Sequence, residues 1–204
     1  MMALYSSENC LDCHRVRFVL AEKGINVEII HVEQDRAATA DLAELNPYSE
    51  TPTLVDRDMV LYGTWVVVDY LDERYPHPPL MPVDPVSRSR LRLAMYRVQR
   101  DWVDAGKVIE SSGGEKKVAT SKKALRDSLV AADDMFGLTP FLLNDELSLA
   151  DCALVPLLWR LPAYGVELSA KVAPNVNKYM DRMFRRDSFQ RSLTEVERAM
   201  REGD

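Results

Sequence analysis

The chain has 204 residues, of which 47% are hydrophobic, enough for one large or two small packed domains. It contains no run of 18 apolar residues and no basic, apolar leader, so we expect neither a membrane span nor a signal peptide. The net charge of −6 argues against autonomous binding to nucleic acid, which needs a concentrated basic face.

The first 74 residues predict strands and helices in the order βαβαββα. Helix 10–23 ends at Gly24, and a polar turn at 56–58 joins the last two strands. Val66, Val67 and Val68 locally favour a strand, because β-branched side chains lose rotamer freedom in helices. The predicted strands are 3–5, 27–32, 53–55 and 59–61, and the predicted helices are 10–23, 37–45 and 64–74.

Pro52 stands immediately before the third strand, where a residue without an amide hydrogen is tolerated. This strand–turn–strand–helix stretch resembles the thioredoxin-like domain of glutathione transferases. The resemblance implies a cis proline, with the residue before it, Thr51, offering its backbone to the cysteinyl unit of glutathione. That family grips the γ-glutamyl end of glutathione with a Glu-Ser pair, where this chain has Gly63 and Thr64. The resemblance therefore implies a vestigial site, with glutathione possible as a cofactor but disfavoured.

Prolines interrupt the pattern after residue 75 and mark a boundary between two domains. Pro76-His77-Pro78-Pro79 cannot continue a helix, because each residue before a proline is pushed toward extended backbone. We therefore expect an α/β domain at 1–76, a proline-rich linker at 77–85, and an all-α domain at 86–204. The linker is either a stiff spacer or a preformed binding surface that carries a titratable imidazole.

The second domain is helical throughout its predicted pattern. Helix 86–111 ends near Gly113-Gly114, and helix 122–136 stops at Gly137. Ser148 and Asp151 form a predicted capping box, which glutathione transferases carry on a buried helix of their second domain. Pro156 lies inside a predicted helix that it should kink, and Pro174 suits the first turn of another helix. Two further helix caps are predicted, one formed by Asp187 with Gln190 and one by Ser192 with Glu195.

Cys10 and Cys13 lie at the predicted start of the first helix. Free amides there can lower a thiol pKa, and His14 could add a positive charge. Cys10 matches the position of the catalytic cysteine or serine in several transferase classes, and the spacing also suits a redox dithiol. Unremarkable thiols are the favoured interpretation, and zinc is disfavoured because no second ligand pair exists. Three cysteines without a leader favour reduced thiols in the cytoplasm, and Cys152 is expected in a core.

The chain most closely resembles the bacterial stringent starvation protein A family, whose members are homodimers with the glutathione transferase fold. The shared segments cover nearly the whole chain: residues 20–24, 52–57, 70–82, 156–162, 187–189 and 192–195. The resemblance implies association with RNA polymerase holoenzyme, regulation of transcription under starvation and acid stress, and no transferase catalysis. Its implied partner-binding surface is Pro76, His77 and Pro78.

A non-catalytic member of that family is not expected to need thiols at positions 10 and 13. The presence of Cys10 and Cys13 therefore keeps a second interpretation open. In it, the protein is a glutathione-dependent transferase or thiol reductase using Cys10.

Overall fold

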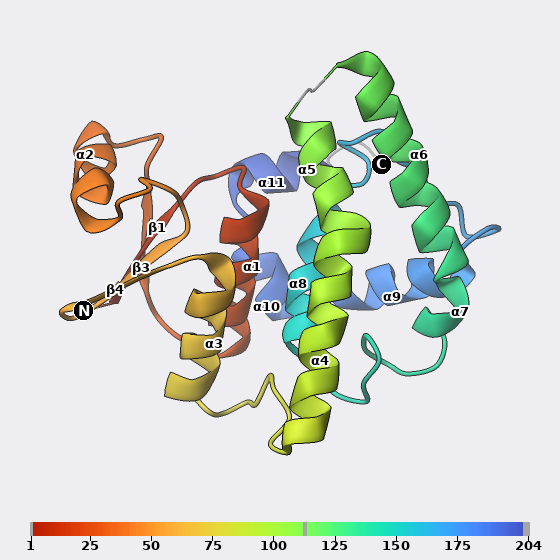
Figure 1. Ribbon diagram of the computed structural model, residues 1–204, viewed down its shortest axis with the longest axis horizontal. Coiled ribbons are helices and arrows are strands. Elements are labelled where there is room, and N and C mark those ends of the chain that lie inside the picture. Colours follow the sequence, from red (N-terminus) through yellow and green to blue (C-terminus); the bar gives the residue numbers. More distant parts are fainter. Residues whose placement is uncertain (1, 112–113, 202–204) are drawn as a thin grey trace. The chain divides into compact units, whose positions relative to one another are not determined.

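The computed structural model describes residues 2–111 and 114–201, and Figure 1 traces its elements along the chain. Contacts within the chain divide it into two compact units. The first unit runs to Pro78 and also includes Asp187–Ala199, and the second runs from Pro79 to Arg186 and resumes at Met200. The predicted boundaries of the linker, at 76–77 and 85–86, stay predictions.

The first unit contains a mixed four-stranded sheet in the order β2-β1-β3-β4. Strand β1 (Met2–Ser6) pairs in parallel with β2 (Glu28–His31) and antiparallel with β3 (Thr53–Asp56), which forms a hairpin with β4 (Met59–Tyr62). Together with its helices, this confirms the predicted order βαβαββα and the thioredoxin-like domain.

Helices pack on the two faces of this sheet, as Figure 1 shows. Helix α2 (Arg36–Leu45) places Ala38 and Leu42 against Tyr5 of β1. Since side chains alternate along a strand, the buried Leu4 points to the opposite face, on the side of α1 (Leu11–Glu22) and α3 (Thr64–Arg74). The valine run of α3 is helical because this packing buries Val67 and Val68, which outweighs their local preference for a strand.

Two short C-terminal helices belong to the first unit. Helices α10 (Asp187–Ser192) and α11 (Glu195–Ala199) follow the second unit in sequence, and α10 packs against α1. The predicted cap of Ser192 with Glu195 is wrong, because Thr194 and Glu197 form a reciprocal pair instead. The Glu197 N–H donates to Thr194 Oγ1 at 3.1 Å, and the Thr194 N–H donates to Glu197 Oε2 at 3.0 Å. Ser192 Oγ donates to the Phe189 carbonyl at 2.6 Å.

In the described residues of the second unit, the regular secondary structure consists of helices, joined by turns and loops that include one isolated bridge pair. Its first helix, α4, continues without a break through a π-helical segment η1 into α5, close to the predicted helix 86–111. Helix α8 is buried along its entire length and forms the centre of this unit. The bounds are α4 (Pro85–Val98), η1 (Gln99–Val103), α5 (Asp104–Glu110), α6 (Glu115–Ala131), α7 (Asp133–Phe136), α8 (Leu149–Trp159) and α9 (Pro174–Phe184).

The predicted start of the next helix at residue 122 is wrong, because α6 begins at Glu115. Gly114, at a φ of 97°, precedes it, while Gly113 lies outside the described residues. The two buried side chains of α6, Leu125 and Leu129, lie in its later turns. The polar first turns therefore lack the apolar periodicity on which the prediction depended.

The predicted capping box of α8 is confirmed. The Ser148 N–H donates to Asp151 Oδ2 at 2.9 Å, and the Ala150 N–H donates to Ser148 Oγ at 3.3 Å. Burial raises the pKa of the Asp151 carboxyl, although the Tyr179 hydroxyl and two backbone amides donate to it. Pro156 lies inside α8, and Pro174 begins α9 as predicted. Among the described residues, no helix combines the length and apolarity that crossing a membrane requires.

Candidate functional site

The loop before β3 has the geometry that the glutathione transferase resemblance implies. The Thr51–Pro52 peptide bond is cis, and Pro52 is buried while Thr51 is half-buried. The fully buried Asn46 fixes the loop, because its amide donates to Thr53 Oγ1 at 3.0 Å and to the Glu50 carbonyl at 3.1 Å. The predicted cis proline is therefore confirmed, and a polar side chain that the sequence did not single out holds it in place.

Cys10 and Cys13 lie together at the N-terminus of α1. Cys10 is the N-cap residue, and the Cys13 N–H donates to its Sγ at 3.2 Å. The Ser7 N–H donates in turn to Cys13 Sγ at 3.4 Å. Cys10 is half-buried, whereas Cys13 has no exposed surface. The thiol nearer to solvent is thus Cys10, and the thiol with more neighbouring donors is Cys13.

The two thiols have opposite pKa shifts. The hydrogen bond to Cys13 and burial raise the pKa of Cys10. Burial acts to raise the pKa of Cys13 as well, but donors from Cys10, the Ser7 backbone and the Thr51 hydroxyl outweigh it and lower this pKa to about 7. The geometry therefore stabilises a thiolate on the inaccessible Cys13 and keeps the accessible Cys10 protonated, which weakens Cys10 as a nucleophile.

The start of α3 carries no acidic side chain at the position that resembles the γ-glutamyl grip. Gly63 is the N-cap residue at a φ of 82° and offers no side-chain cap, and Thr64 begins the helix. A Cβ at Gly63 would lie 3.9 Å from Val66 Cγ2, so there is room for one. The positive φ, however, strains any residue other than glycine. The structure thus places Cys10, Thr51, Pro52, Gly63 and Thr64 in one domain, and their role as a vestigial glutathione site stays a prediction.

Beneath α1 lies a buried ionic network that the sequence analysis missed. Arg17 Nη2 donates to both carboxylate oxygens of Glu197, at 2.7 and 2.8 Å. Arg17 Nε donates to the Ser192 carbonyl at 3.0 Å, and His14 Nε2 lies 3.0 Å from Ser192 Oγ. His14 Nδ1 lies 3.5 Å from Glu197 Oε1. The sequence signal that could have indicated this network is Arg17 itself, which lies among the buried residues of α1, because a buried charge needs a partner of opposite charge.

The predicted partner-binding residues form an exposed strip after α3. Pro76, His77 and Pro78 are all exposed, and the His77–Pro78 peptide bond is cis. Lys23 Nζ donates to the Tyr75 carbonyl at 2.7 Å and to the Pro78 carbonyl at 2.6 Å, so the backbone is held on both sides of the strip. The side chains thus face solvent on a backbone with a fixed position in the first unit.

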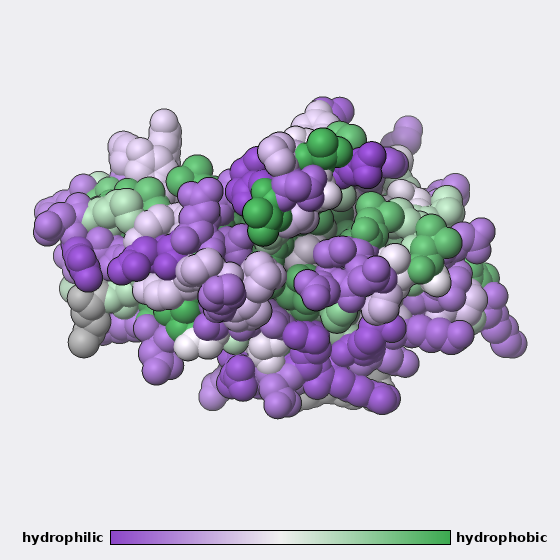
Figure 2. Space-filling view, turned by 90° about the horizontal axis from the view of Figure 1, so that it is seen from below, coloured by the Kyte–Doolittle hydropathy of each residue, from purple (hydrophilic) through white to green (hydrophobic). Residues whose placement is uncertain are grey.

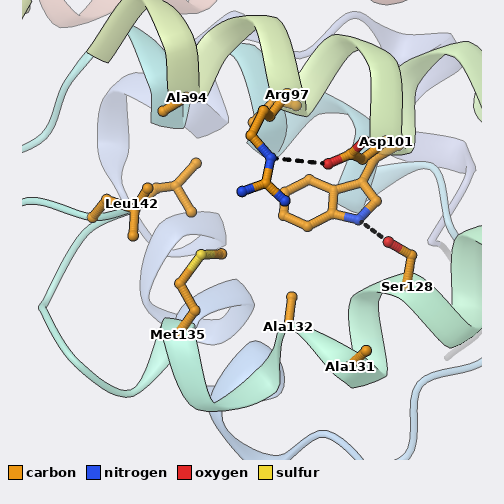
Figure 3. Close-up of a pocket in the computed structure, with 11 residues that line it drawn as sticks. Ala94, Arg97, Asp101, Ser128, Ala131, Ala132, Met135 and Leu142 are labelled. Atoms are coloured by element: carbon orange, nitrogen blue, oxygen red, sulfur yellow. Dashed lines mark hydrogen bonds and ion pairs between the residues drawn. The ribbon is translucent and has the colours of Figure 1, made fainter. Parts of the chain in front are cut away.

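A cavity of about 300 Å³ lies within the second unit, between α4 with η1 and α6 with α7. Figure 3 shows Ala94 and Arg97 facing Met135 and Ala132 across it. Arg97 Nε donates to Asp101 Oδ2 at 3.3 Å on its wall. Its lining includes none of the predicted site residues.

Comparison with known proteins defines the class. Residues 4–79 match the N-terminal domain family of glutathione S-transferases, and residues 90–187 match the C-terminal domain family. A crystal structure of a glutathione S-transferase from Methylobacillus flagellatus with bound glutathione is 26% identical, with a TM-score of 0.82. The alignment covers 95% of this chain and 99% of that one. The protein therefore has the glutathione transferase fold, an α/β thioredoxin-like domain followed by an all-α domain.

The family follows from full-length relatives. The stringent starvation protein A homolog of Coxiella burnetii is 47% identical over 204 residues, which is 100% of this chain and 97% of the relative. That of Haemophilus influenzae is 44% identical over 96% of this chain and 92% of the relative. The chain belongs to the stringent starvation protein A family. Enzymes of the superfamily are more distant, such as mouse maleylacetoacetate isomerase at 28% identity, with 81% of each chain covered.

Proposed function

We propose that this protein regulates transcription in starvation and acid stress by binding RNA polymerase holoenzyme, without transferase catalysis. The observation that carries the proposal is the exposed strip Pro76–His77–Pro78 on a backbone held by Lys23. Two proline rings and one imidazole offer apolar area and a polar anchor, and little backbone entropy is left to lose on binding. Membership in the stringent starvation protein A family supports the same partner.

The geometry of the transferase site supports a non-catalytic role. A glutathione enzyme needs a group for the γ-glutamyl end and an activated nucleophile. Gly63 has no side chain to supply the first, and the raised pKa of Cys10 opposes the second. In this proposal, the role of the glutathione transferase fold is to present the binding surface Pro76–His77–Pro78.

We also propose that two copies associate into a homodimer. Helix α4 exposes large apolar side chains along its length, including Val86, Leu93 and Tyr96, with exposed fractions of 61, 59 and 58%. Figure 2 shows hydrophobic residues grouped among hydrophilic ones on one face of the molecule. Obligate interfaces bury such surface. Light scattering at micromolar concentration should report about twice 23.2 kDa, and a monomer would refute this part of the proposal.

The main test replaces Pro76, His77 and Pro78 together by alanine. The three side chains are exposed, so the variant should keep its circular dichroism and thermal stability. Its affinity for purified holoenzyme, measured by biolayer interferometry, should fall at least tenfold, about 1.4 kcal/mol. A matched control replaces two exposed residues by alanine, Asp58 in the β3–β4 turn and Met59 at the start of β4, and should bind normally. A folded triple variant that binds and regulates like the native protein would overturn the proposal.

The second candidate is a glutathione-dependent transferase or thiol reductase using Cys10. It is favoured by one observation, the dithiol at the N-terminus of α1 with a pKa of about 7 for Cys13. Turnover of a small disulfide or of an electrophile with glutathione, lost in Cys10→Ser, would establish it. The holoenzyme affinity of Cys10→Ser should be unchanged if the main proposal holds.

A further inference from the structure

The strongest unexplained feature of the first unit is a buried ammonium group at Lys23. Lys23 is the C-cap residue of α1, and its side chain has no exposed surface. A buried lysine is unfavourable unless its three N–H donors all find acceptors. Lys23 holds the backbone of the proposed partner surface but is not one of its three exposed side chains, so what its burial contributes to binding needs a separate explanation.

Lys23 Nζ has three acceptors from three neighbouring places in the chain. It lies 2.5 Å from Asp72 Oδ1, which is in the last turns of α3. It donates to the carbonyl of Tyr75, the C-cap residue of α3, at 2.7 Å. The third acceptor is the Pro78 carbonyl at 2.6 Å. One ammonium thus joins the end of α1, the end of α3 and the strip that follows α3.

The chemistry of the strip makes these carbonyl contacts important. Pro76 and Pro78 have no amide hydrogen, so they cannot fix their own backbone by donating hydrogen bonds. Their backbone can be fixed only through carbonyl acceptors, and Lys23 donates to the carbonyl of Tyr75, which precedes Pro76, and to the carbonyl of Pro78. All three side chains between these two carbonyls point to solvent. The clamp therefore fixes the backbone and leaves the contact surface free.

We propose that Lys23, paired with Asp72, is a positioning residue that holds Pro76–His77–Pro78 in the conformation that RNA polymerase holoenzyme binds. This inference rests on the proposed function of the strip. Lys23 itself is buried and does not touch the partner. It acts by ordering the strip before binding, so that association loses less conformational entropy. Its removal should weaken binding although every contacting side chain is still present.

The test uses the full-length protein with Lys23→Met and Asp72→Asn combined. Lys23→Met alone would leave the Asp72 carboxylate buried without its cation, which can unfold a domain. The double variant removes both charges and leaves the Tyr75 and Pro78 carbonyls without this donor. We expect its holoenzyme affinity to fall at least tenfold, while the strip sequence is unchanged.

A second readout separates positioning from general loss of structure. The chain has three histidines, His14, His31 and His77, all in the first unit. In the double variant, the imidazole C–H NMR signals of His77 should shift or broaden, while those of His14 and His31 stay in place. Leu42→Ala, in the separate cluster between α2 and the sheet, serves as a control for destabilisation without a change in the strip.

Each outcome decides the inference. Weakened binding of the double variant with a local change at His77, and near-native binding of Leu42→Ala, supports it. Native-like binding of the double variant, while the Pro76, His77 and Pro78 triple variant loses binding, overturns the role of Lys23 and leaves the proposed function intact. Equal weakening of Leu42→Ala also overturns it, because destabilisation alone would then explain the loss. Native-like binding of the triple variant removes the proposed function and this inference together.

Discussion

The buried pair of Arg17 and Glu197 allows a quantitative prediction about Glu197→Gln. Glu197 has no exposed surface and accepts two hydrogen bonds from Arg17 Nη2 and one from the Thr194 N–H. Glutamine has the same shape but no charge, and one of its two terminal atoms donates instead of accepting. One guanidinium donor would therefore face an amide donor, in a place that water does not reach.

The expected loss is about 3–5 kcal/mol of unfolding free energy, the usual effect of removing one partner of a buried ion pair. Two hydrogen bonds to a charged group, at roughly 1.5–3 kcal/mol each, give a similar sum. Since domains are stable by only about 5–15 kcal/mol, this substitution should remove a large part of the stability.

Urea denaturation followed by circular dichroism measures this loss through the transition midpoint and the slope. Glu195→Gln is the matched control, because Glu195 is exposed two residues earlier on α11, and it should change the midpoint little. Replacing Arg17 by Met together with Glu197 by Leu should recover much of the loss, since no unpaired charge is left buried. A loss below about 1 kcal/mol for Glu197→Gln would refute the reasoning, because a buried pair cannot be broken so cheaply.

Three further predictions concern the rest of the chain. Isothermal titration should give no micromolar affinity for glutathione, because the missing charge-assisted bond at Gly63 removes roughly 1.5–3 kcal/mol; a micromolar constant would contradict this. Thiolate absorbance should rise near pH 7 and disappear in Cys13→Ser. Because the Cys13 pKa of about 7 lies below its unfolded value, the contribution of this thiolate to stability is present above the unfolded pKa and is lost as pH falls through 7. An absorbance step only above pH 8 would contradict the lowered pKa of Cys13. Ser148→Ala should lower the unfolding free energy by about 0.5–2 kcal/mol in urea, and an unchanged midpoint would show that the cap is dispensable.

The order of elements in the first domain could be predicted because each boundary has local chemistry. Gly24 ends α1 at a φ of 62°, and Pro52 precedes β3. Helix α3 was harder to predict from the local sequence, since Val66, Val67 and Val68 favour a strand, and only the packing that buries Val67 and Val68 makes the segment helical. Helix α6 shows the limit of periodicity, because its polar first turns carry no apolar pattern.

The candidate site was predictable where it depends on residue type and not where it depends on distant partners. Cys10, Thr51, Pro52 and Gly63 follow from short motifs. The acceptor for Arg17 is 180 residues away, and those of Lys23 are 49 to 55 residues away. No spacing rule connects such pairs. The lower pKa of Cys13 likewise depends on Ser7 and Thr51, which the fold brings to the thiol.

The return of α10 and α11 to the first domain has a consequence for protein synthesis. At about 5–20 residues per second, the 180 residues between Arg17 and Glu197 take roughly 10 to 40 s to translate. During that time α1 has emerged from the ribosome, but the carboxylate that neutralises its guanidinium does not yet exist. The native packing of the first domain therefore waits for a glutamate that is translated 180 residues after the arginine it neutralises.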